Sequence, residues 1–180
     1  MFVQTQNTPN PNSLKFLPGK KVCNTEPFEI IDKNYTDNEL VRNILSINGV
    51  EGIFLAEEFL SVNKQENINW EDIKHIIISF INDYYSSGKE IVIDKNKKTS
   101  ETKELLDIEK KIINLLETKV RPAVARDGGD IKFENYKDGV VQVKLQGSCS
   151  GCPSSKMTLK QGVQNILCHY IPEIKEVVAN

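Results

Sequence analysis

The chain has 180 residues, of which 39% are hydrophobic and 27% are charged, and its net charge is −2. These values are typical of a folded globular protein and exclude disorder along most of the chain. No apolar run is long enough to cross a bilayer, and no dense lysine and arginine stripe is interleaved with aromatic residues, so we expect neither a membrane nor a nucleic acid as partner.

The cysteines and the N-terminus point to a reducing compartment. Cys23, Cys149, Cys152 and Cys168 are too few for a disulfide scaffold. The first twelve residues resemble neither a signal peptide nor an arginine-rich transit segment. The bacterial cytoplasm is therefore the default expectation, although a mature organellar protein whose presequence has been removed would look the same.

The first half of the chain predicts the element order ββαββα. The predicted elements are strands at 2–6 and 13–16, a helix at 37–47, strands at 50–55 and 59–63, and a helix from 69 or 72 to 86. Asp37 can cap the first helix, and Asn48-Gly49 ends it. The second helix carries an apolar stripe from Ile73 to Tyr84 at helical spacing.

A polar segment separates the two halves. Residues 89–104 are mostly polar and charged and show no sustained helical or strand period. We therefore predict a linker at 89–104 between one domain at 1–88 and another at 105–180.

The second half predicts the order αββαβ. The predicted elements are a helix at 105–120, strands at 130–136 and 140–146, a helix at 153–170 and a final edge strand at 173–178. Pro122 is expected to end the first helix, and Asp138-Gly139 is a strong hairpin signal. Together the halves predict an α+β fold of two small domains.

Cys149 and Cys152 form a Cys-x-x-Cys pair between a predicted strand and a predicted helix. Thiolates bind metals, and the pKa of a cysteine falls at a helix N-terminus. Zinc sites and iron–sulfur clusters generally need four protein ligands, so two are missing. Cys168 would lie roughly 24 Å beyond Cys152 along a continuous helix, and Cys23 belongs to the other predicted domain. A second copy of the chain, related by a two-fold axis, would complete the site, so we expect a metal centre shared in a dimer.

Two other interpretations of the cysteine pair stay open. A dithiol–disulfide oxidoreductase also uses Cys-x-x-Cys, but a thioredoxin-like fold needs a βαβ unit before the motif, where this sequence predicts a hairpin. A structural zinc site across a dimer would also use four cysteines. We expect Cys23 and Cys168 to be ordinary packing residues.

Four stretches of the sequence carry a family resemblance. They are Thr8–Gly19, Val120–Asp130 with its Arg-Pro-x-x-x-x-Asp-Gly-Gly-Asp pattern, Gly147–Ser155 around the two cysteines, and Met157–Leu159. With these stretches the chain resembles the Nfu-type (NifU-like) iron–sulfur cluster carriers along nearly its whole length.

The resemblance implies a function without turnover chemistry. It implies that Cys149 and Cys152 of two protomers hold a [4Fe–4S] cluster in a homodimer. Zinc is a possible substitute, because four cysteines also suit that metal. The cluster would come from upstream iron–sulfur assembly proteins and go to apo iron–sulfur client proteins. Separately, the change of composition at the linker suggests that the N-terminal domain is a protein-recognition module on a flexible tether. No ligand role carries over to Asp127–Asp130, which we expect to form the turn that opens the hairpin.

Overall fold

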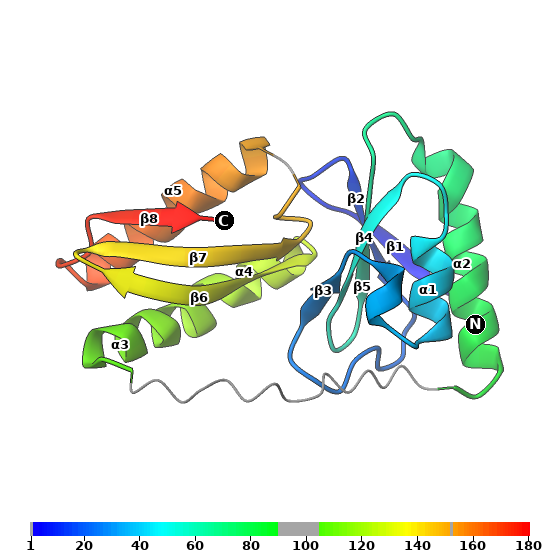
Figure 1. Ribbon diagram of the computed structural model, residues 1–180, viewed down its shortest axis with the longest axis horizontal. Coiled ribbons are helices and arrows are strands. Elements are labelled where there is room, and N and C mark those ends of the chain that lie inside the picture. Colours follow the sequence, from blue (N-terminus) through cyan, green and yellow to red (C-terminus); the bar gives the residue numbers. More distant parts are fainter. Residues whose placement is uncertain (1, 90–104, 152) are drawn as a thin grey trace.

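The computed structural model describes residues 2–89, 105–151 and 153–180, and it has the α+β architecture that the sequence predicts (Figure 1). Two large, separate hydrophobic cores form, one in the N-terminal part (2–89) and one in the C-terminal part (105–180), and a third, small cluster joins Phe54, Ala56 and Phe59. Most of the predicted linker, residues 90–104, and Cys152 lie outside the described residues. Within the described ranges, none of the helices has the length and apolar character needed to cross a membrane.

The N-terminal part is a five-stranded antiparallel sheet in the order β1-β2-β5-β4-β3, with helices on one face (Figure 1). Its elements are β1 (Gln4–Asn7), β2 (Ser13–Leu17), β3 (Phe28–Ile30), a 3₁₀ turn η1 (Lys33–Tyr35), α1 (Glu39–Leu45), β4 (Val50–Leu55), β5 (Leu60–Lys64) and α2 (Trp70–Ser86). The predicted order is found with one addition, β3, which is too short to show a strand period. Asn38, not Asp37, caps α1, because its Oδ1 accepts a hydrogen bond from the Val41 N–H at 3.2 Å.

The two faces of this sheet have different neighbours. Alternate strand residues such as Leu14, Phe16 and Val62 point toward α1 and α2 and belong to the first core. The opposite face carries a row of directly paired residues, one from each of four strands, which we call the docking row: Lys15, Ser61, Phe54 and Glu29. This face turns toward the C-terminal part (Figure 1).

The C-terminal part is a three-stranded sheet in the order β6-β7-β8, in which β8 pairs parallel to β7 at the edge. Its elements are α3 (Asp107–Leu115), a π-helical turn η2 (Leu116–Val120), α4 (Arg121–Arg126), β6 (Gly129–Lys137), β7 (Val140–Gly147), α5 (Pro153–Tyr170) and β8 (Glu176–Ala179). The predicted order αββαβ is found. Asp138 and Gly139 both have positive φ, 51° and 87°, as a two-residue hairpin turn requires.

The predicted helix ends at Val120, the last residue of η2, but the chain does not leave the helical path before Pro122, because α4 begins at Arg121. The helical path continues through η2 into α4, where Pro122 occupies the first turn. A proline is tolerated there because its missing N–H costs no intrahelical hydrogen bond. The Arg121 N–H donates instead to the Leu116 carbonyl, five residues back, which is the wider spacing of a π turn.

Candidate functional site

Cys149 lies on the short loop between β7 and α5, which is held by hydrogen bonds to the turn after α4. The Ser148 N–H donates to the Gly128 carbonyl at 3.2 Å, and the Ser148 hydroxyl donates to the Asp127 carbonyl. The Ser150 N–H and hydroxyl both donate to the Gly147 carbonyl, at 3.2 and 2.8 Å. These bonds fix the backbone on both sides of Cys149. Cys152, the second predicted ligand, lies outside the described residues.

Gly129 forms the floor under the thiol. A Cβ atom at this position would lie 2.7 Å from Cys149 Sγ and 2.7 Å from the Gln146 carbonyl oxygen. Such distances are too short for a carbon atom, so the thiol can occupy its place only beside a glycine. The Asp-Gly-Gly-Asp pattern therefore opens β6 and also makes room for Cys149.

Arg121 and Asp130 join the start of α4 to the start of β6. Arg121 donates two hydrogen bonds to the Asp130 carboxylate, at 2.8 and 3.0 Å, and Asp130 is only 4% exposed. The hydrogen bond to Asp130 also raises the pKa of Arg121 above its usual high value. This paired arrangement is among the stronger side-chain contacts in proteins. Arg121 and Asp130 are the first and last residues of the Arg-Pro-x-x-x-x-Asp-Gly-Gly-Asp pattern. Their contact thus holds Gly129, the floor under the thiol, in place.

The pKa of Cys149 is shifted upward in the structure, whereas the sequence led us to expect a downward shift. The thiol is 7% exposed, and burial is the main reason why its pKa is raised. The charges of Asp127 and Asp130 raise it further, while the Ser148 hydroxyl lowers it. A lowered pKa was expected for a cysteine at a helix N-terminus. Cys149 lies four residues before the start of α5 and is covered, so burial dominates.

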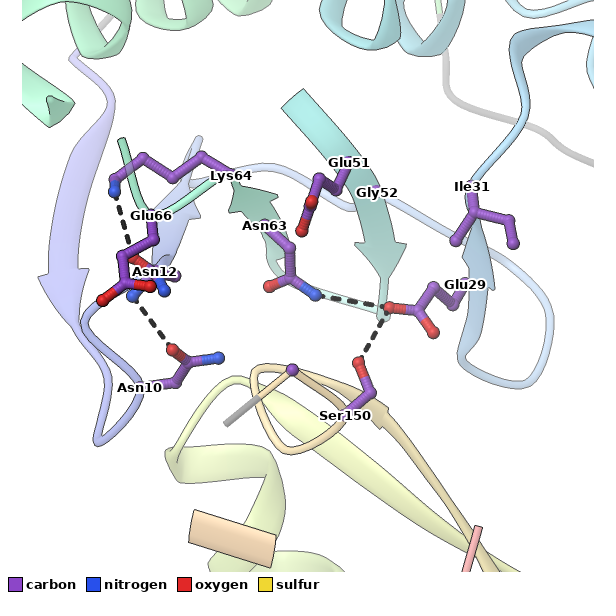
Figure 2. A pocket seen from close by; sticks show the side chains of 11 residues that line it. Asn10, Asn12, Glu29, Ile31, Glu51, Gly52, Asn63, Lys64, Glu66 and Ser150 are labelled. Atoms are coloured by element: carbon purple, nitrogen blue, oxygen red, sulfur yellow. Dashed lines mark hydrogen bonds between the residues drawn. The ribbon is translucent and has the colours of Figure 1, made fainter. Parts of the chain in front are cut away.

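Side chains of the N-terminal part cover this loop, which the sequence did not predict. Asn10 Nδ2 donates to the Ser148 carbonyl at 3.0 Å, and Asn63 Nδ2 donates to the Gly147 carbonyl at 3.0 Å. The Ser150 hydroxyl lies 3.3 Å from Glu29 Oε1 and donates to it. Figure 2 shows Asn10, Asn63 and Glu29 around Ser150, lining a polar cavity of about 350 Å³. Burial raises the pKa of Glu29, partly offset by its hydrogen bonds to the loop.

Lys15 adds a charged contact between the two parts. Its ammonium group donates to the Ala125 carbonyl at 3.1 Å and to the Arg126 carbonyl at 3.4 Å, at the C-terminal end of α4. A cation is favourable at the C-terminal end of a helix, where carbonyl groups are unpaired. The same ammonium lies 4.0 Å from the centre of the Phe59 ring, and burial lowers the pKa of Lys15.

A second cavity, of about 400 Å³, opens beside Cys149. Val124 of α4 and Leu159 and Val163 of α5 give it an apolar lining, and Pro9 and Asn10 of the N-terminal part form part of its wall. Cys149 therefore lines an open cavity to which both parts of the protein contribute residues.

The other cysteines are packed separately. Cys23 is 1% exposed in the first core, and its sulfur lies 3.0 Å from the Thr25 hydroxyl. Cys168 packs against the second core, and its thiol donates to the Ile174 carbonyl at 3.2 Å. Within the part of the chain that the structure describes, no three His, Cys, Asp or Glu residues are grouped to hold a metal ion.

Some of the residues that make the newly found contacts have a signal in the sequence, and others have none. Asn10 and Lys15 lie in the Thr8–Gly19 stretch that carries the resemblance, so a role for this stretch beyond a hairpin turn could have been sought. Glu29 and Asn63 gave no signal, because a polar residue that alternates with buried ones in a strand usually faces water.

Comparisons with known proteins match one family model to each part of the chain. The family model described as "Scaffold protein Nfu/NifU N terminal" matches residues 3–88, and the one described as "NifU-like domain" matches residues 112–178. The chain is 42% identical over 180 residues to the "NFU1 iron-sulfur cluster scaffold homolog, mitochondrial" of Homo sapiens, covering 98% of this chain and 71% of that protein.

Two further proteins are similar to the chain. It is 40% identical over 184 residues to "NifU-like protein 4, mitochondrial" of Arabidopsis thaliana, covering 98% of this chain and 65% of that protein, just under two thirds of its length. A solution structure of a NifU-like protein from Saccharomyces cerevisiae is 29% identical, with a TM-score of 0.47, and covers 53% of this chain and 86% of that one. The family matches and the identity to the human protein confirm the resemblance found in the sequence: the chain belongs to the Nfu family of NifU-like scaffold proteins, which are not enzymes.

Proposed function

We propose that the protein carries iron–sulfur clusters, binding a [4Fe–4S] cluster as cargo through Cys149 and Cys152 of each of two chains. One observation carries this proposal. Cys149 lies on a loop of small residues, and the described part of a single chain offers no set of further ligands around it. Four thiolates, two from each chain, would satisfy a cluster that one chain leaves incomplete.

The fold supplies two features that suit such cargo. The loop ends at the N-terminus of α5, an 18-residue helix, whose unpaired N–H groups offset the negative charge of a cluster with four thiolates. The small residues Gly147, Ser148, Ser150 and Gly151 leave room for a second backbone or an incoming client thiol. Both features favour a cluster that is held and then passed on.

The two parts of the chain would divide the work. Residues 105–180 hold the cluster, and residues 1–88 recognise partner proteins, with 89–104 as the linker. The partners are an upstream assembly protein that supplies the cluster and apo-proteins that receive it. The human and Arabidopsis relatives named above are mitochondrial by name, and the compartment of this protein is either an organelle of that kind or the bacterial cytoplasm.

Anaerobic reconstitution with iron and sulfide tests the proposal. We expect about four irons and four sulfides per two chains, in a species with the native mass of a dimer. Cys149→Ser and Cys152→Ser should each abolish this loading, and Cys168→Ser is the matched control that should keep it. A complete cluster on a monomer, or full loading without Cys149, would contradict the proposal.

The same experiment separates the two rival interpretations. A structural zinc site predicts about one zinc per two chains and no exchange of iron into the site. A dithiol–disulfide enzyme predicts reduction of insulin disulfides by the iron-free protein, lost on Cys149→Ser. Either result without iron loading would replace the carrier function.

A further inference from the structure

The face of the N-terminal sheet that points away from α1 and α2 is buried, although an antiparallel sheet commonly leaves such a face in water. In the docking row, Ser61 is 0% exposed, Phe54 is 1% exposed and Lys15 is 8% exposed. The covering residues belong to the C-terminal part. A Cβ at Gly128 would lie 2.8 Å from Ser61 Oγ, and a Cβ at Gly147 would lie 3.0 Å from the Phe54 ring.

Four residues of the cysteine loop take part in this contact. Gly147 and Ser148 accept hydrogen bonds from Asn63 and Asn10, and Ser150 donates to Glu29. A Cβ at Gly151 would lie 3.3 Å from Asn10 Nδ2. The residues on both sides of Cys149 therefore face the N-terminal sheet.

A second chain would need the same space. To share one cluster, the cysteine loop of the second chain must approach Cys149 to a distance no greater than the width of that cluster. The wall of the cavity beside Cys149 includes Pro9 and Asn10, and Asn10 is itself 1% exposed. The N-terminal loop therefore takes up part of the space beside Cys149 that a second cysteine loop would need.

We propose that the docking row and Asn10 form an internal docking surface for the chain's own cysteine loop, and that this docking excludes the sharing of a cluster with a second chain. The second half of this statement rests on the function proposed above. The N-terminal part is then a reversible cover: it lies over Cys149 in the single chain and moves away when two chains join.

The chemistry of the contact suits a cover that opens. Its hydrogen bonds join side-chain amides, a lysine and a carboxylate to backbone carbonyls and a hydroxyl, and water can replace each partner on separation. The two larger hydrophobic cores lie on either side of this contact, and a third, small cluster of Phe54, Ala56 and Phe59 lies on the docking face of the sheet. Separation leaves the two larger cores intact and uncovers Phe54 of the small cluster.

Alkylation of Cys149 in the iron-free full chain tests the docking. The double variant Asn10→Ala/Asn63→Ala removes two donors to the loop, in a Cys152→Ser background so that Cys149 is the reactive thiol there. We expect iodoacetamide to modify Cys149 about tenfold faster than in the background protein, from the loss of two hydrogen bonds. Mass spectrometry identifies the modified peptide, and buried Cys23 reports any general unfolding.

The matched control is Asn12→Ala. Asn12 lies on the same loop as Asn10, but its Oδ1 accepts from Lys64 Nζ at 3.1 Å within the N-terminal part. Its alkylation rate should stay within about twofold of the background protein. Lys15→Met, which removes the donor to the end of α4, is a second docking variant and should also speed alkylation, even where the double variant folds poorly. Equal rates in the background protein, both docking variants and the control would overturn the docking surface.

Iron loading tests the exclusion separately, in the chain with both cysteines. Asn10→Ala/Asn63→Ala should form the iron-loaded dimer several-fold faster than the unmodified chain and reach the same final iron content. Faster alkylation with an unchanged rate of dimer formation would overturn the exclusion and leave the docking. Failure of every protein to load iron would refute the carrier function instead, and the alkylation rates would still decide whether the cover exists.

Discussion

At the scale of single residues, the position of the Cys149 thiol depends on residue 129 being a glycine, which has no side chain. Cys149 Sγ fits because Gly129 has no Cβ, and the ion pair of Arg121 with Asp130 holds that glycine in place. The sequence predicted that Cys149 matters, from its spacing to Cys152. It could not predict why Gly129 matters, because the approach of residues 129 and 149 arises only when β6 and β7 pair.

Gly129→Ala should destabilise the C-terminal part and lower its iron content. The added methyl group must displace either Cys149 Sγ or the Gln146 carbonyl, and overpacking of this kind costs roughly 1–3 kcal/mol. Thermal denaturation and iron analysis after reconstitution measure the two effects. Gly162→Ala on α5 is the control: nothing lies within 4 Å of a Cβ there, so it should stabilise by about 0.5–1 kcal/mol. Similar behaviour of the two variants would contradict the role of Gly129.

At the scale of elements, the helices and strands with a clear period were predicted and the irregular ones were not. In α2 the predicted Ile73, Ile77 and Ile81 are buried, and the predicted Phe80 and Tyr84 are partly buried against the same core. Tyr85, which was not predicted, is also buried there, and its hydroxyl donates to the Lys21 carbonyl at 3.0 Å. The helical path through Pro122 was missed because a π turn leaves no period of its own in the sequence.

Burial of Tyr85 makes the N-terminal part sensitive to high pH. Burial, with a smaller contribution from Tyr84, raises the pKa of Tyr85 from 10.0 to about 12. Between these values the unfolded chain loses the proton while the folded chain keeps it, so stability is complete below pH 10 and falls as the pH rises toward 12. From pH 9 to pH 11 the loss should be roughly 1 kcal/mol.

Urea denaturation of the full chain at both pH values measures this loss. Tyr85→Phe should be less stable at pH 9, because the Lys21 carbonyl loses its donor, but should show a smaller decline toward pH 11. Tyr35→Phe, at an 86% exposed tyrosine, is the control and should decline as the unmodified chain does. An equal decline in the Tyr85 variant would contradict the assignment.

At the scale of the whole molecule, the two larger cores are separated by a contact that joins polar groups and also includes buried Phe54. The order of elements in both parts could be predicted, since each depends on local patterns. The way the parts face each other could not, because a hydrogen bond such as that of Asn10 with Ser148 joins residues 138 positions apart and leaves no pattern in the sequence. The part of the candidate site contributed by the N-terminal sheet therefore came from the structure alone.

Separate cores predict separate unfolding. Ile77→Ala removes a fully buried side chain of α2, and Leu167→Ala removes one of α5. Each should destabilise its own part by about 2–5 kcal/mol, and calorimetry should show one transition lowered and the other nearly unchanged. A single transition that both variants shift equally would mean that the two parts unfold as one unit.

The N-terminal sheet is covered on both faces, and this also affects which substitutions the protein can accept. In β2 and β5 the even-numbered residues Leu14, Phe16 and Val62 build the core, and the odd-numbered residues Lys15, Ser61 and Asn63 touch the other half of the molecule. Neighbouring positions in one strand thus have different roles: one packs in the core and the next contacts the other part of the protein. Substitutions at the odd positions can make the cover tighter or looser in small steps while the packing behind the sheet stays the same, so the readiness of the thiol for a partner can evolve without putting the fold at risk.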